Sequence, residues 1–250
     1  MTTTGAPAPS SSRPYWPHCG HGADTAGNPV GCRGRQVEPH DACLAHLTDT
    51  DRTTYLNGLA PGSDLDHRGT HFADYLLEQV LNRLHDPTTG RPHLGTARFD
   101  GATFSANASF SKATFSANAW FDGATFSAEA WFDEAAFSAE ASFAGATFSA
   151  YASFSKATFS AYASFDRATF STTASFTMAT FSADARFQEA AFAAGAEFEL
   201  ATFSAAVSFD RATFSGSARF LRAAFEAASH LEPVSLTGHC FVAGLVSLLR

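Results

Sequence analysis

The sequence has few of the residues on which catalytic and metal sites depend, and little positive charge. Its 250 residues include four cysteines, and 16 lysines and arginines stand against 24 acidic residues for a net charge of −8. Such a balance argues against a nucleic-acid-binding protein, because phosphate binding usually needs a basic face. The few, unevenly placed cysteines argue against a secreted disulfide framework and indicate a reducing, cytoplasmic setting.

Membrane and export signals are also lacking. No segment approaches the run of roughly 20 apolar residues that crosses a bilayer, so we expect no membrane association. The N-terminus, MTTTGAPAPSSSRPYWP, has no basic stretch followed by an apolar one, so it does not read as a signal peptide. We interpret residues 1–14 as a disordered tail rich in serine, threonine and proline.

Residues 97–228 contain no proline, histidine or cysteine. A nucleophilic serine needs a nearby base, and the isolated glycines form no phosphate-binding loop, so we expect no enzyme here. The change of composition divides the chain into the tail, a small Cys/His-containing module (15–96), a repeat array (97–228) and a C-terminal segment (229–250).

Phenylalanine is abundant where the other residues are missing. The array holds 24 of the 26 phenylalanines, and the spacing between them alternates between five and six residues from Phe99 to Phe225. The residue two positions before each phenylalanine is alanine, with Val207 as the one exception. A strict internal period of this kind predicts a repeat architecture.

The 11-residue period excludes the simpler repeat structures. A right-handed helical supercoil has this period, but steps of five and six put successive phenylalanines on helix faces roughly 140° apart. A strand meander would turn every second phenylalanine to the opposite face. A coil that turns a corner after each short segment keeps every alanine and phenylalanine inside. Four segments make a 22-residue turn, so the 132 residues of the array predict six turns with phenylalanines stacked 22 apart.

The repeated units ATFSA, ASFSK and AWFDG resemble the pentapeptide-repeat family, whose consensus is A-(D/N)-L-x-x with leucine or phenylalanine at the centre. The resemblance implies a mainly β fold, a right-handed quadrilateral β-helix, and a bacterial protein. It departs from the common pattern because alternate repeats carry a sixth residue, which leaves the square cross-section open. We expect these extra residues at outward corners: Asn107, Asn118, Glu129, Glu140, Tyr151, Tyr162, Thr173, Asp184, Gly195, Ala206 and Ser217.

For function, the resemblance implies a non-enzymatic scaffold that binds an unidentified protein partner. Some members of the family instead bind DNA gyrase as mimics of DNA, which is the alternative. Four acidic residues, Asp100, Asp122, Asp166 and Asp210, would share one edge of the coil as a line of carboxylates. Arg167 and Arg211 follow two of them and would neutralise them. The array has 13 acidic and 8 basic residues, and its net charge of −5 is modest for a mimic.

Four aromatic residues are expected on the outside of the early and middle turns: Trp120, Trp131, Tyr151 and Tyr162. Aromatic side chains are enriched at the centres of protein interfaces. These four therefore form either a partner-binding patch or isolated surface rings.

The N-terminal module carries a second signal. Cys19, Cys32, Cys43 and His46 follow the spacing C-x12-C-x10-C-x2-H, and thiolates with an imidazole suit tetrahedral Zn²⁺. The C-x2-H pair resembles the second half of small treble-clef-like zinc modules, while His21 is a rival ligand. Four protein ligands leave no open position, so the zinc would be structural. The alternative is three buried reduced thiols and an ordinary histidine.

Two helices are expected in the rest of the module. Residues 48–59 fit a short helix, and residues 70–85 fit a stronger one that ends at Asp86-Pro87 and covers the open first turn of the coil. Between them, DLDHRGT (64–70) is interpreted as a capping loop rather than a site. At the other end, the apolar residues 240–250 predict a lid, a homodimer contact or a truncated continuation of the coil.

Overall fold

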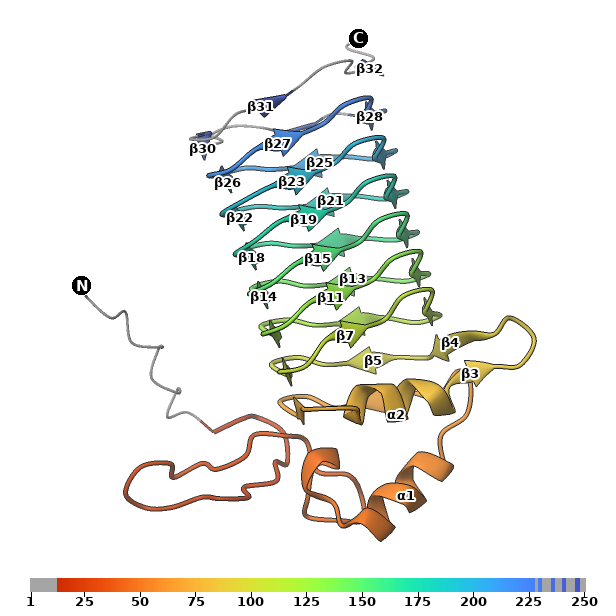
Figure 1. Cartoon of the computed structure of the whole chain (residues 1–250), viewed down its shortest axis with the longest axis vertical. Coiled ribbons are helices and arrows are strands. Elements are labelled where there is room, and N and C mark those ends of the chain that lie inside the picture. Colours follow the sequence, from red (N-terminus) through yellow and green to blue (C-terminus); the bar gives the residue numbers. More distant parts are fainter. Residues whose placement is uncertain (1–12, 228, 231–234, 237–239, 242–245, 248–250) are drawn as a thin grey trace.

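The computed structural model describes residues 13–227, 229, 230, 235, 236, 240, 241, 246 and 247. Most of the molecule is a column of stacked coils, with two helices and an irregular segment at its N-terminal end (Figure 1). The irregular segment includes a 3-10 helix, η1 (Leu44–His46), and the helices are α1 (Asp49–Asn57) and α2 (Leu76–Arg83).

Two opposite sides of the column carry the strands made of an alanine and the residue after it. The first side, the β5 face, is the parallel sheet of β1 (Leu65–Asp66), β5 (Ala97–Arg98), β9 (Ala119–Trp120), β13 (Ala141–Ser142), β17 (Ala163–Ser164), β21 (Ala185–Arg186), β25 (Val207–Ser208) and β29 (Ser229–His230). The second, the β7 face, consists of β7 (Ala108–Ser109), β11 (Ala130–Trp131), β15 (Ala152–Ser153), β19 (Ala174–Ser175), β23 (Ala196–Glu197), β27 (Ala218–Arg219) and β31 (Cys240–Phe241).

The other two sides carry the strands that contain the phenylalanines of the Thr-Phe units. The β6 face consists of β2 (His71–Phe72), β6 (Thr103–Phe104), β10 (Thr125–Phe126), β14 (Thr147–Phe148), β18 (Thr169–Phe170), β22 (Ala191–Phe192), β26 (Thr213–Phe214) and β30 (Ser235–Leu236). The β8 face consists of β3 (His85–Asp86), β4 (Arg91–Leu94), β8 (Thr114–Phe115), β12 (Ala136–Phe137), β16 (Thr158–Phe159), β20 (Thr180–Phe181), β24 (Thr202–Phe203), β28 (Ala224–Phe225) and β32 (Val246–Ser247). Among these pairs only β3 and β4 are antiparallel.

The register of the sheets confirms the predicted 22-residue turn. Thr125 pairs with Thr147, and Ala130 pairs with Ala152, so each residue lies above the one 22 positions earlier. Since every turn adds one strand to each of four sheets, the coil has four sides even with the sixth residue in alternate repeats. The structure is thus the predicted four-sided β-solenoid of about six turns.

Two kinds of corner account for the alternation of five and six. After each strand of the β5 and β7 faces in the array the chain makes a tight turn, as where Ala102 N donates to Phe99 O at 2.9 Å. The third residue of that turn has positive φ, for example 63° at Gly101 and 61° at Lys112, which is typical of a type II turn. The six-residue step makes a wider bend, and none of the predicted outward residues at that bend is buried.

The phenylalanines fill the interior as columns of stacked rings. Phe126 and Phe148 lie 4.7 Å apart between ring centroids with planes 1° apart, and neighbouring columns meet edge to face, as Phe132 and Phe143 do at 5.2 Å and 85°. Offset stacking and edge-to-face contact are the favourable geometries for aromatic pairs. The alanines beside them are buried as well. The alanine and phenylalanine positions of the repeat are therefore used for packing.

The solenoid begins before residue 97, where the sequence placed its boundary. Leu65 pairs with Ala97, and Phe72 pairs with Phe104 and stacks on it at 5.0 Å. Residues 65–72 are thus irregular copies of the repeat. The predicted helix over 70–85 is wrong at its start, because Phe72 belongs to strand β2 and α2 begins only at Leu76. The helix predicted over 48–59 is confirmed as α1.

Helix α2 closes the first coil. It lies below β7, on the side where the next strand of the β7 face would stand (Figure 1). Its buried residues Leu77, Val80 and Leu81 belong to the same hydrophobic cluster as the phenylalanine columns. The predicted cover of the open first turn is therefore confirmed. In the C-terminal segment the described residues extend the four sheets by one strand each, β29 to β32; the rest of the predicted lid or dimer contact lies outside the described residues.

Candidate metal centre and outer faces

The four predicted ligands come from three short pieces of backbone. Residues 18–20 pair antiparallel with residues 32–35, as Cys19 N donates to Gly34 O at 2.9 Å and Gly20 N to Cys32 O at 2.8 Å. Cys43 stands at the N-terminus of η1 and His46 at its end. One helical turn separates these two residues, so their side chains project from the same side of η1.

The structure brings the four ligand atoms together. His46 Nδ1 lies 3.4 Å from Cys19 Sγ and 3.4 Å from Cys43 Sγ, and Cys32 Sγ lies 3.7 Å from Cys43 Sγ. All four atoms are within 4.8 Å of one another. Sulfur ligands at the usual bond length around a tetrahedral zinc would be roughly 3.8 Å apart. The cluster could therefore hold a metal ion.

His21, the rival ligand, is not part of the cluster. Its ring stacks on the ring of His46, with centroids 4.2 Å apart and planes 22° apart, and its carbonyl accepts a hydrogen bond from Cys32 N at 2.9 Å. The His21 ring thus supports the orientation of His46. This contact could not be read from the sequence, where its spacing to Cys19 made it look like a ligand.

Thiol chemistry and close packing both suit a metal at this position. The hydrogen bond with Cys43 lowers the pKa of Cys32 to about 5, and the same contact raises the pKa of Cys43, which is buried. A lowered thiol pKa favours the thiolate, which is the form that binds a metal ion. A Cβ on Gly34 would lie 2.6 Å from Cys43 Cβ, so this packing requires glycine.

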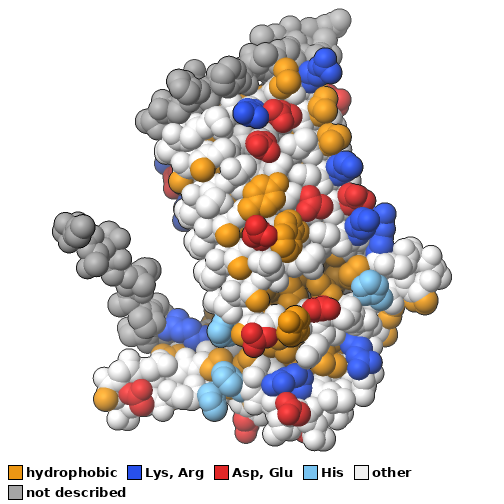
Figure 2. Space-filling model, in the orientation of Figure 1, with side chains coloured by type: hydrophobic (Ala, Val, Ile, Leu, Met, Phe, Trp, Pro, Cys, Tyr) orange, Lys and Arg blue, Asp and Glu red, His pale blue; other side chains and the backbone are white. Residues whose placement is uncertain are grey.

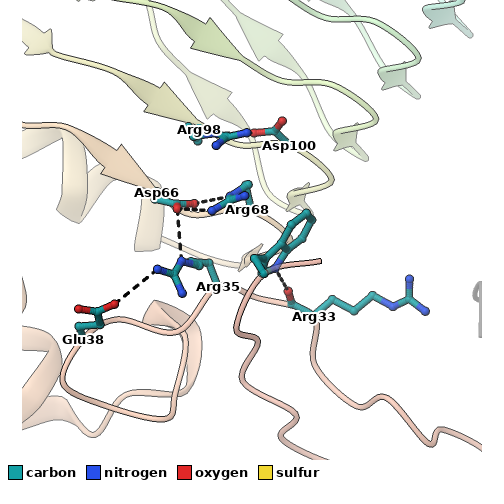
Figure 3. Close-up of polar contacts among 8 residues, drawn as sticks. Arg33, Arg35, Glu38, Asp66, Arg68, Arg98 and Asp100 are labelled. Carbon is teal, nitrogen blue, oxygen red and sulfur yellow. Dashed lines mark hydrogen bonds and ion pairs between the residues drawn. The ribbon is translucent and has the colours of Figure 1, made fainter. Parts of the chain in front are cut away.

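The predicted capping loop joins this module to the solenoid. Arg68 makes two contacts with the Asp66 carboxylate, at 2.7 and 2.6 Å, and Arg35 adds a third at 3.3 Å (Figure 3). Burial would raise the pKa of Asp66, but the hydrogen bonds from Arg68 hold it below its usual value. The Arg68 guanidinium also lies over the Trp16 ring, 5.0 Å from its centroid. The DLDHRGT segment therefore serves as a docking loop.

His67 occupies the phenylalanine position of the first, irregular coil. It is fully buried, with its ring 5.7 Å from Phe72 and 6.2 Å from Phe99, and its Nε2 lies 3.1 Å from the Tyr55 hydroxyl. Burial lowers the pKa of His67 to about 4. A neutral histidine thus ends the aromatic column and links it to helix α1.

The predicted carboxylate ladder lies along one corner of the β5 face: Asp100, Asp122, Asp166 and Asp210. Asp122 accepts hydrogen bonds from the Ser142 side chain and from Ala144 N, the latter at 3.1 Å. These donors belong to the next coil. The Asp122 carboxylate is therefore engaged within the protein.

The other ladder residues also contact side chains of this chain, from the same, the next or the preceding coil. Asp166 pairs with Arg186 at 3.1 Å, and Asp100 pairs with Arg98 at 3.4 Å. Gln188 Nε2 lies 3.5 Å from Asp210. The predicted neutralisation by Arg211 is wrong, because Arg211 turns back to Glu189, at 2.9 Å. Arg167 forms no ion pair among the described residues.

The four predicted aromatic residues lie on two opposite faces. Trp120 lies in β9 and Tyr162 directly precedes β17, both on the β5 face, whereas Trp131 lies in β11 and Tyr151 precedes β15, on the β7 face. All four are partly exposed. The structure therefore does not bring them together as one patch. The reason is that 11 residues make half a turn of the coil.

Comparisons with known proteins agree with the fold. A family model described as pentapeptide repeats (9 copies) matches residues 94–136, 121–169 and 154–202 in overlapping segments. No curated protein and no solved structure matches the chain. Within the described residues, no helix has the length and apolar character to cross a membrane. The coil and the repeats that match it over residues 94–202 make the chain a pentapeptide-repeat protein.

Proposed function

We propose that the protein is a non-enzymatic scaffold whose outer faces bind a protein partner in the cytoplasm. The observation that carries this proposal is the contrast between inward and outward positions. Phenylalanine and alanine recur inside with almost no change, whereas the outward residues of the β5 and β7 faces change from coil to coil. Regular solenoids present extended surfaces of this kind to partners.

Site-specific photocrosslinking tests the scaffold. A photoreactive residue at Tyr151, on the variable β7 face, should capture a partner in a lysate of the source organism. The same residue at Thr147, on the uniform β6 face, is the matched control and should capture little. If neither position yields a crosslinked product at low or high salt, the scaffold proposal fails.

We also propose that Cys19, Cys32, Cys43 and His46 bind one zinc ion that holds the N-terminal module together. The support is the separation of the four ligand atoms, the contact between the Cys32 and Cys43 sulfurs that lowers the pKa of Cys32, and the requirement for glycine at position 34. With four protein ligands, the metal would stabilise folding and have no position for a substrate.

Mimicry of DNA at a gyrase or a related topoisomerase is the second candidate from the family resemblance. The contacts of the ladder do not favour it, because Asp100 and Asp166 pair with arginines of this chain, and Ala144 and Gln188 interrupt the row of carboxylates. A supercoiling assay separates the two candidates. We expect no inhibition of supercoiling at micromolar protein, and inhibition that Asp122→Asn and Asp166→Asn relieve would support the mimic instead.

A further inference from the structure

The two tryptophans of the array occupy equivalent positions, half a coil apart, but their surroundings differ. On the β5 face the Arg98 guanidinium lies over the Trp120 ring, 5.0 Å from its centroid. Arg98 is the register partner of Trp120 in the preceding coil, and its Nε is 3.4 Å from the Asp100 carboxylate. Arginine stacks well on tryptophan while pairing with a carboxylate. Trp120 is thus part of a complete triad of aromatic ring, guanidinium and carboxylate.

Trp131 lacks the other two members of that triad. Its register partner in the preceding coil is Ser109, and the residue that matches Asp100 is Ser111. The sequence Arg98-Phe99-Asp100 on one face is replaced by Ser109-Phe110-Ser111 on the other. Among the described residues no guanidinium or ammonium group lies over the Trp131 ring.

A groove of about 700 Å³ lies beside Trp131, between helix α2 and the first coils of the β7 face. Its lining includes Leu77 and Leu81 of α2 and Pro92 of β4, together with Tyr75, which is 73% exposed. Figure 2 shows hydrophobic and acidic side chains close together over the lower part of this face. A groove of this size admits a peptide segment but not a folded domain.

The charges around the groove are mainly negative. Asp74 and Glu78 line it from the side of α2. Lys112 is the one lysine or arginine among the described lining residues, and His85 lies there too. Neither Asp74 nor Glu78 forms an ion pair among the described residues. The groove therefore offers an aromatic ring and unpaired carboxylates without the cation found on the opposite face.

We propose that this groove binds an arginine-bearing segment of the partner protein, with one guanidinium stacked on Trp131 and paired with the carboxylates of the groove. The partner's arginine would take the place that Arg98 takes over Trp120. The proposal rests on the proposed scaffold function and specifies the chemistry of the partner. Arginine fits better than lysine because its planar group stacks on the ring and still donates to carboxylates in that plane.

Fluorescence anisotropy with short labelled peptides tests this site directly. The probes are a peptide with arginine at alternate positions, and the same peptide with lysine or with glutamate. We expect the arginine peptide to bind several times more tightly than the lysine peptide, and the glutamate peptide not to bind. Trp131→Ser should weaken arginine-peptide binding about tenfold, the loss expected of a partly desolvated cation–π contact.

Matched variants separate this site from general attraction to an acidic protein. Trp120→Ser removes the equivalent ring on the opposite face and should leave binding unchanged. The double variant Ser109→Arg, Ser111→Asp copies the Arg98 and Asp100 arrangement onto the β7 face. The introduced arginine should stack on Trp131 and so abolish peptide binding. Both serine replacements of tryptophan match residues already present in the same columns, Ser142 and Ser153, so the coil should fold.

The proposal is overturned if the arginine and lysine peptides bind equally, if Trp131→Ser binds like the native chain, or if the double variant still binds. Failure here can be told from failure of the scaffold. If the arginine peptide does not bind while a photoreactive group at Tyr151 still captures a partner, the partner contacts the β7 face through groups other than an arginine on Trp131. If both are negative, the scaffold itself is excluded.

Discussion

The repeat array and the N-terminal module achieve order in different ways. In the array each coil hydrogen-bonds to the next, and all the phenylalanines except Phe220 and Phe225 are buried in stacked columns. Residues 13–64 bury few apolar side chains, Val30, Val37, Leu44, Leu47 and Leu56 besides Cys43. A small segment with so little core usually needs a disulfide or a metal. The comparison indicates that periodic packing holds the array together, whereas the module would depend on the zinc that we propose at its Cys/His cluster.

Removal of the metal should produce the largest effect, and only in the module. Cys43→Ser should lose about one equivalent of zinc, since binding to a structural site contributes on the order of 10 kcal/mol to folding. Hydrogen exchange should then become fast over residues 15–60 and stay slow in the array. Gly34→Ala, which would crowd Cys43, should give a milder form of the same result. A metal content unchanged in Cys43→Ser would exclude this ligand set.

A substitution in the phenylalanine core should destabilise the array and leave the N-terminal module folded. Phe154 stacks between Phe132 and Phe176 at 4.8 and 4.9 Å and is fully buried. Phe154→Ala should lower the free energy of unfolding by about 3–5 kcal/mol through lost burial and the cavity left behind. Chemical denaturation followed by circular dichroism measures the loss.

The control for this change is Phe154→Leu, which keeps most of the volume and should cost less than about 1.5 kcal/mol. The zinc content of both variants should equal that of the native chain. If Phe154→Ala released the metal as well, the two regions would form one cooperative unit, and the contrast between them would be lost.

Much of this contrast could be predicted from the sequence because both regions have a simple signature. The phenylalanine spacing allows one arrangement that keeps every ring inside, and the Cys/His spacing indicates the residues that the fold brings together as a possible metal site. What failed depended on distant partners. Residues 70–75 have helical spacing, but pairing with Thr103 and Phe104 draws His71 and Phe72 into a strand. The aromatic residues can be assigned to two opposite faces only when it is known that 11 residues make half a turn of the coil.

The irregular first coil, where the two regions meet, should be sensitive to pH through His67. Its pKa is lowered by burial to about 4, against about 6.5 when unfolded. The unfolded chain therefore binds the proton more readily, and stability is complete above about pH 6.5 and falls as the pH drops toward 4. The full loss is up to about 3 kcal/mol.

The measurement is the difference in unfolding free energy between the native chain and His67→Phe across this range. The variant places in the first coil the residue that the array uses at the same position. It should be less dependent on pH, although the Tyr55 hydroxyl loses its partner. Parallel pH profiles for the two proteins would show that His67 does not set the acid stability of the junction.

The smallest expected effect tests the tight corners, the feature that makes the array regular. Gly145 has φ of 65°, and a Cβ added there would meet no atom within 4 Å, whereas Lys156 adopts 58° at the next equivalent corner. Gly145→Ala should therefore cost about 1 kcal/mol from backbone strain alone. Lys156→Gly relieves that strain but frees the unfolded chain, so its change should be smaller than that of Gly145→Ala. Equal losses in both variants, measured by denaturation, would mean that side-chain contacts rather than backbone conformation determine these corners.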